Sequence, residues 1–203
     1  LLDESITGIS VKEDGPPSLD LSKIDFELLA KRFKESKQKN TNIEVLKAAI
    51  RATLERLVRL NPTRADFVSN FEALIESYNA GSQNIEELFD ELMKLSASLS
   101  EEQERHVLEQ MTEEELVIFD ILTRPAPELS PEEREEVKKV ARLMLARLKE
   151  LLILNWRQKS AARSQLKLNI EDTLDGGLPR AYPPGLFKKK CTAVFEHVFE
   201  SYP

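Results

Sequence analysis

The sequence predicts an all-α fold, a multi-helix domain of about seven to nine helices with no sheet. Apolar residues recur at steps of three and four along most of the chain, as they do on the buried face of an amphipathic helix. Capping-box patterns, in which a hydroxyl residue precedes Glu or Gln by three positions, stand before several of these stretches. No segment alternates apolar and polar residues over the length of a strand with enrichment in β-branched residues.

The first eighteen residues differ from the rest of the chain. They end near the breakers Gly15-Pro16-Pro17 and lack sustained periodicity, which indicates an irregular lead-in or linker over 1–18. The helical domain is predicted over 19–203. The first residues have neither a basic region nor a signal-type apolar core, and we expect the chain to be part of a longer protein.

Caps and breakers predict the first two helices. Ser22 starts a helix that fades over 37–40, and Thr41 or Asn42 caps the next one. The second helix carries one apolar and one charged stripe, and it stops before Pro62 because proline disfavours a helical residue in front of it.

Two or three further helices are predicted before residue 110. One runs from Thr63 to a glycine C-cap at Gly81, and another is marked by apolar residues over 85–95. The pattern Ser100-x-x-Gln103 resembles a capping box and predicts a new helix start.

Capping boxes at Thr112 and Ser130 predict two more helix starts, the second with Pro131 at the first helical position. The short stiff segment 124–127 connects these helices. If the domain consists of two subdomains, we expect the seam near 124–130.

The last quarter of the chain predicts two helices. The first runs from Trp156 to Leu174 and is broken by the Gly-Gly and Pro residues of 175–179. The second carries apolar residues over 186–199.

Charge and cysteine content restrict the classes of function. The net charge is −7, but residues 76–154 carry −10 and residues 155–203 carry +3, so only the last quarter is suited to meeting phosphate. The single cysteine, Cys191, excludes an internal disulfide and is expected to be a packed side chain. No run of about 18 apolar residues is present, and we expect no membrane contact and a cytoplasmic location.

Searches for catalytic patterns do not identify an active site. No glycine-rich phosphate loop precedes a Lys-Ser or Lys-Thr pair, and His106 and His197 lie far apart. The Glu clusters stand at helix starts, where they complement the helix dipole. We therefore predict no catalytic, metal or cofactor residue in this chain.

One stripe of residues is a candidate binding surface. On a helix that starts at Trp156, the side chains of Trp156, Lys159, Arg163 and Lys167 fall on one face. An aromatic residue flanked by cations can stack on a base or anchor a partner protein. Alternatively, the basic stems cover the rim of the core while Trp156 packs inside. The run Lys188-Lys189-Lys190 is expected to be a solvated helix face.

Several segments together resemble the C-terminal helical region of the restriction (motor) subunit of type I restriction enzymes. The similarity spans residues 20–203 and lies in the order and spacing of weak motifs: Leu60–Phe67, Leu74–Gly81, Glu113–Leu122, Lys138–Ala141, Asn155–Lys159, Leu178–Pro179 with Tyr182, and Phe187 to His197.

The resemblance implies a piece of a large bacterial or archaeal enzyme that uses ATP and Mg to translocate double-stranded DNA before cleaving it. The catalytic motifs of that family lie upstream of this region, so none is carried onto these residues. The implied partners are the methyltransferase and specificity subunits, onto which this region would dock the motor. The alternative is a helical domain that contacts duplex DNA directly and guides it to the motor.

Overall fold

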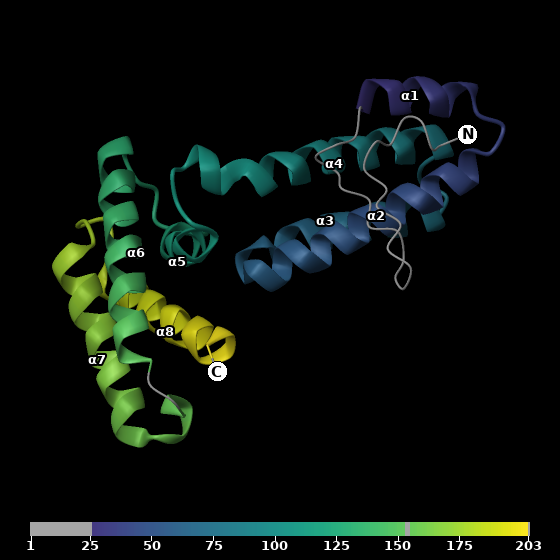
Figure 1. The fold of residues 1–203 in the computed structure, drawn as a ribbon. Helices are drawn as coiled ribbons and strands as arrows, with labels where there is room; N and C mark the ends of the chain where they lie inside the picture. The colour runs from purple at the N-terminus through teal and green to yellow at the C-terminus, as the bar shows by residue number, and fades with distance from the viewer. Residues whose placement is uncertain (1–25, 153–154, 203) are drawn as a thin grey trace. The chain divides into compact units, whose positions relative to one another are not determined.

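The computed structural model describes residues 26–152 and 155–202. Within these residues it has eight α-helices and two short 3-10 helices and no strand (Figure 1). The all-α prediction and the predicted number of helices are therefore confirmed. The lead-in predicted over 1–18 and the start of the first helix at Ser22 lie outside the described residues.

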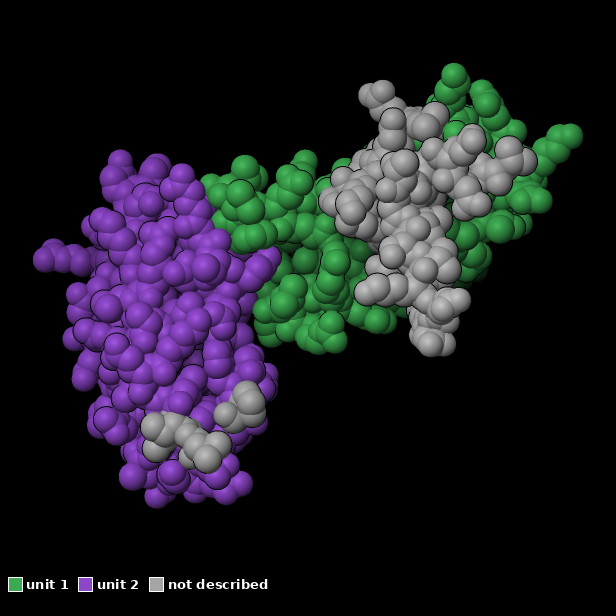
Figure 2. Space-filling view, in the orientation of Figure 1, with its two compact units in different colours: residues 1–109 green, residues 110–203 purple. Residues whose placement is uncertain are grey.

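The chain divides into two compact units, residues 1–109 and residues 110–203, which are described separately (Figure 2). The segment 124–130, where we expected any seam, lies within the second unit and connects two of its helices. No helix of the described part is both long enough and apolar enough to cross a membrane.

The first unit packs its helices around one apolar core. It contains α1 (Phe26–Glu35), α2 (Lys39–Leu60), the 3-10 helix η2 (Pro62–Arg64), α3 (Ala65–Asn79) and α4 (Ile85–Leu108). Helices α2 and α3 both pack on α4. Their buried residues recur at helical spacing, and the core includes the stacked rings of Phe33 and Phe89, 3.7 Å apart.

Two helix starts predicted in the first unit are wrong. Helix α2 begins at Lys39 after Gln38, so Thr41 and Asn42 lie inside the helix and do not cap it. Helix α4 continues through Ser100, because buried Leu99 and Glu102 extend its packed face past that point. The capping box of α4 is formed by Asn84 and Glu87.

The second unit has its own core. It contains α5 (Glu113–Thr123), α6 (Pro131–Leu151), the 3-10 helix η3 (Trp156–Gln158), α7 (Ser160–Gly177) and α8 (Pro184–Ser201). Helix α6 packs on α5 and α7, and α8 packs on the same two helices. The capping boxes at Thr112 and Ser130 are confirmed, each with both reciprocal hydrogen bonds.

The end of α7 lies very close to α6. A Cβ atom added at Gly177 would come within 2.6 Å of Cγ2 of Val140, closer than real atoms pack. Because valine is stiff at χ1, Val140 cannot simply rotate out of the way. Glycine at 177 therefore permits the close packing of α7 on α6. The helix break predicted at 175–179 is also observed, since α7 ends at Gly177.

Candidate functional site: the surface between α7 and α8

The structure separates Trp156 from the basic residues that the sequence placed beside it. Trp156 opens the 3-10 helix η3 after Asn155, which has a left-handed backbone with φ of 59°. Lys159 is extended, with φ of −95° and ψ of 110°, and α7 begins only at Ser160. The single helix predicted from Trp156 is therefore wrong, and the 100° spacing does not link Trp156 to Arg163 and Lys167.

Trp156 is a buried residue of the second unit, only 1% exposed. Its indole Nε1 donates a hydrogen bond to the Tyr202 carbonyl oxygen at 3.1 Å, and its ring meets Phe199 edge-on at 5.8 Å. The alternative in which Trp156 packs inside is therefore the one observed. Trp156 holds the end of α8 on the core and does not present its ring at the surface.

The three cations of the predicted stripe have different surroundings. Lys159 is exposed. Arg163 is half-buried, and its guanidinium donates to the Arg157 carbonyl oxygen. The exposed Lys167 places its ammonium 4.6 Å from the ring centroid of Phe195, within the range of a cation–π interaction. A binding role for these residues stays a prediction.

Arg163 and Lys167 line one edge of a surface groove between α7 and α8, named here the α7–α8 groove. It consists of two adjoining hollows of about 600 Å³ and 220 Å³, which share Lys167, Phe195 and Glu196. The α7 edge is formed by Arg163, Lys167 and Glu171.

Helix α8 supplies the floor and the other edge of the groove. Every fourth residue along the helix forms the floor: Phe187, Cys191, Phe195 and Phe199. The residue directly after each floor residue is exposed and forms the α8 edge of the groove: Lys188, Thr192, Glu196 and Glu200. This alternation follows from the helical period, because positions four apart share a face.

The thiol of Cys191 is packed into the groove floor. It is 7% exposed, and burial, with a smaller effect of Glu171, raises its pKa to about 11. A thiol with so high a pKa is almost entirely protonated at neutral pH and is a weak nucleophile. The structure therefore agrees with the interpretation of Cys191 as a packed side chain.

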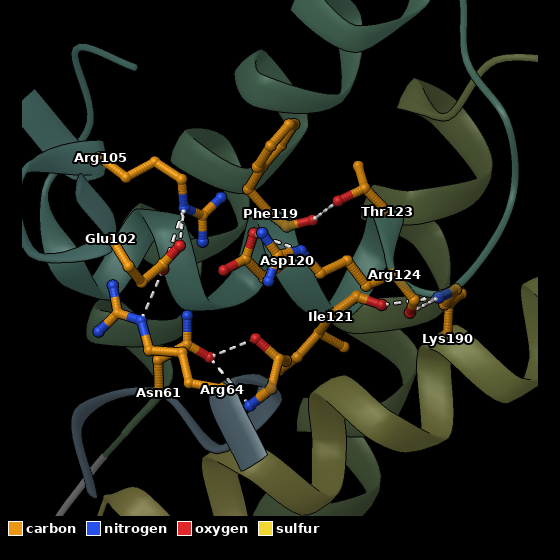
Figure 3. Close-up of polar contacts among 11 residues, drawn as sticks. Asn61, Arg64, Glu102, Arg105, Phe119, Asp120, Ile121, Thr123, Arg124 and Lys190 are labelled. Atoms are coloured by element: carbon orange, nitrogen blue, oxygen red, sulfur yellow. Dashed lines mark hydrogen bonds and ion pairs between the residues drawn. The ribbon is translucent and has the colours of Figure 1, made fainter. Parts of the chain in front are cut away.

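Lys190 is not on the solvated face predicted for the Lys188-Lys189-Lys190 run. Its ammonium donates to the carbonyl oxygens of Ile121 and Arg124 at 2.8 and 2.6 Å (Figure 3), and burial lowers its pKa. The Tyr182 hydroxyl donates to Leu122 at 3.2 Å. These side chains therefore donate hydrogen bonds to carbonyl groups that the end of α5 cannot pair within its own helix.

A polar cluster in the first unit involves the segment 60–67, one of those that carry the family resemblance. The Asn61 side chain caps η2 by accepting from the Thr63 amide and hydroxyl, at 3.1 and 2.7 Å. Arg64 is fully buried, and its Nε lies 2.8 Å from the carboxylate of Glu102, which Arg105 also contacts (Figure 3). The 60–67 segment therefore has a structural role in joining α2 to α4.

These features define an all-helical domain with a mixed-charge groove on its second unit. The chain belongs to the family described as type I restriction enzyme HindI endonuclease subunit-like, C-terminal, whose model matches residues 9–202. The resemblance identified from the sequence is confirmed. Comparison with curated proteins and with solved structures gave no significant match.

Proposed function

We propose that this chain is the docking domain of a type I restriction subunit, which holds the ATP-dependent DNA-translocating endonuclease on the methyltransferase–specificity core. The observation that carries the proposal is the α7–α8 groove, which combines an apolar floor with charged edges. Protein interfaces have this organisation, with apolar anchors at the centre and a polar rim. A helical platform also binds with little ordering entropy.

Direct binding of duplex DNA has less support. Arg163, Lys167 and Lys188 line the groove, but Glu171, Glu196 and Glu200 line it too. Phosphates bound along this groove would lie close to its carboxylates as well as to its cations. The resulting repulsion would offset the attraction of the basic residues. A partner protein whose surface carries both acidic and basic residues complements this mixture of charges better.

The proposal extends to the parent enzyme and its location. We propose that ATP and Mg act in upstream parts of the parent subunit, that this domain makes or breaks no bonds itself, and that the assembly works in the cytoplasm. An ATPase and nuclease assay of the chain alone should then give only background activity.

The docking proposal is tested by measuring the affinity of the chain for the purified methyltransferase–specificity complex. Charge reversal at Lys159, Arg163 and Lys167 should weaken binding about tenfold or more. The matched control reverses three exposed cations of the same unit that lie outside the α7–α8 groove, Lys139, Arg180 and Lys189, and makes the same change in net charge.

Binding of the control should remain near that of the unchanged chain. If the unchanged chain does not bind the core, the docking proposal is wrong. If it instead binds duplex DNA with an affinity that falls steeply with added salt, the DNA alternative replaces it.

A further inference from the structure

We propose that the α7–α8 groove accepts one amphipathic α-helix of about three turns from the methyltransferase–specificity core, with opposite charges on its two flanks and the order of these charges exchanged between its two ends. This inference rests on the proposed docking function and specifies its contact. It is argued from the floor, the edges and the shape of the groove.

The floor has the length and spacing of a helix-binding row. From Phe187 to Phe199 the row covers twelve residue steps of α8, or about 18 Å at 1.5 Å per residue. A helix laid against such a row anchors itself with apolar side chains at positions i, i+3 or i+4, and i+7. Phe199 is 40% exposed, so an apolar surface is available for these anchors.

At one end of the groove, the α7 edge is basic and the α8 edge is acidic. In the smaller hollow, Arg163 and Lys167 come from α7, while Glu196 and Glu200 come from α8. A bound helix would therefore present carboxylates to α7 and cations to α8 at this end. Such an arrangement of rim charges selects the partner and its rotation about its own axis.

The order of charge reverses toward the other end of the groove. There Glu171 lies on the α7 edge, and Lys188 lies on the α8 edge. An occupant with a single sign of charge, such as a nucleic acid or a polybasic segment, would be attracted at one edge and repelled at the other along the whole groove. A helix matches both edges when its flank toward α7 is acidic beside Arg163 and Lys167 and basic beside Glu171, and its other flank carries the opposite charges.

A second copy of this chain would also satisfy the charges, because the edges of two facing grooves could pair with opposite signs. The shape of the surface argues against it. Two hollows placed face to face leave an unfilled space, whereas interface cores pack as densely as protein interiors. A convex helix fills the hollow.

The first test is photo-crosslinking from Thr192, which is exposed on the α8 edge and whose hydroxyl donates to the Lys188 carbonyl oxygen of its own helix. The photoreactive residue benzoylphenylalanine replaces Thr192 in the full chain, and the crosslinked peptide from the core complex is identified by mass spectrometry. The same residue at Lys139, exposed on α6, is the control.

The expected product is a core peptide of at least three helical turns with apolar residues at i, i+3 or i+4, and i+7, whose two flanks carry opposite charges in an order that changes from one end of the peptide to the other. Crosslinks to a second copy, to nucleic acid or to a peptide without this pattern overturn the inference. If the chain binds the core but Thr192 crosslinks no more than position 139, the inference fails and the docking function stands. If the chain does not bind the core, the docking function itself fails.

The second test reverses one charge on each edge. Lys167→Glu and Glu196→Lys should each weaken core binding about three- to tenfold, and the double variant, which keeps the net charge, should bind no better than either. A surface that contacts DNA would instead gain affinity from Glu196→Lys and recover in the double variant. Unchanged binding in all three variants overturns the inference.

Lys139→Glu and Glu136→Lys, both exposed on α6, are the matched controls for these single changes. Thermal unfolding followed by circular dichroism checks that every variant keeps its fold.

Discussion

In residues 1–109, the buried carboxylate of Glu102 lies between the guanidinium groups of Arg64 and Arg105; in residues 110–203, the buried ammonium of Lys190 meets backbone carbonyl oxygens. Both units thus bury charged side chains, but Glu102 is satisfied by opposite charge, whereas Lys190 is satisfied by the end of a helix.

The two arrangements should also differ in cost when they are broken. A buried ion pair that loses one partner leaves an uncompensated charge, whereas a lost cap leaves unpaired carbonyl groups. The following substitutions test this comparison, from the largest expected effect to the smallest.

Glu102→Ala should destabilise the first unit by about 3–5 kcal/mol, the cost typical of removing one member of a buried ion pair. The reason is that Arg64 is fully buried and Arg105 is largely buried, so both keep their charge away from water after the carboxylate is gone. The free energy of unfolding is measured by urea titration of the full chain.

Glu101→Ala is the matched control, because Glu101 precedes Glu102 on α4 but is exposed. Its effect should stay within about 0.5 kcal/mol. Equal effects of the two substitutions would show that the ion pair does not stabilise the first unit.

Lys190→Met should destabilise the second unit by about 1–3 kcal/mol, the cost of leaving buried polar groups unsatisfied. Methionine keeps an apolar stem of similar length but cannot donate to the carbonyl oxygens of Ile121 and Arg124. The same urea titration measures the change.

Lys189→Met, at the exposed neighbouring position, should have little effect. If both lysine variants have the same free energy of unfolding, the hydrogen bonds of Lys190 to the end of α5 do not contribute to stability. The contrast between this cap and the ion pairs of Glu102 would then change.

The smallest expected difference in stability is between two residues that both match the capping-box pattern, only one of which caps a helix. Thr112→Ala in the second unit should cost about 1 kcal/mol, because Thr112 accepts from the Glu115 amide at the start of α5. Ser100→Ala in the first unit should be neutral or slightly stabilising, since Ser100 lies inside α4 and alanine favours a helix interior. Thermal unfolding of the two variants compares them directly, and a larger loss at Ser100 would contradict the observed extent of α4.

The same pair shows what the sequence could and could not predict. The same spacing predicted helix starts at Ser100, Thr112 and Ser130. The last two are observed, whereas burial of Leu99 and Glu102 keeps α4 continuous through Ser100. Tertiary packing decides between the two outcomes, and a local pattern does not contain it.

The candidate site was predictable only in part. Arg163 and Lys167 do line one surface, four residues apart on α7. Trp156 does not, because Asn155 adopts a left-handed conformation and Lys159 an extended one, which interrupt the helical register that the spacing assumed. The α8 edge was missed because its charges alternate with the apolar residues of the groove floor. Lys190 was missed because its carbonyl partners lie 66 and 69 residues away.

The contact between Gly177 and Val140 has a consequence for how this region tolerates mutation. Alanine is the mildest replacement in most helices, yet at position 177 its methyl group would push α7 away from α6. Because α7 is one continuous helix, a tilt produced at its end would also displace Arg163 and Lys167, far from the altered residue. A substitution that touches no charge and no groove atom would then change the spacing of the α7–α8 groove.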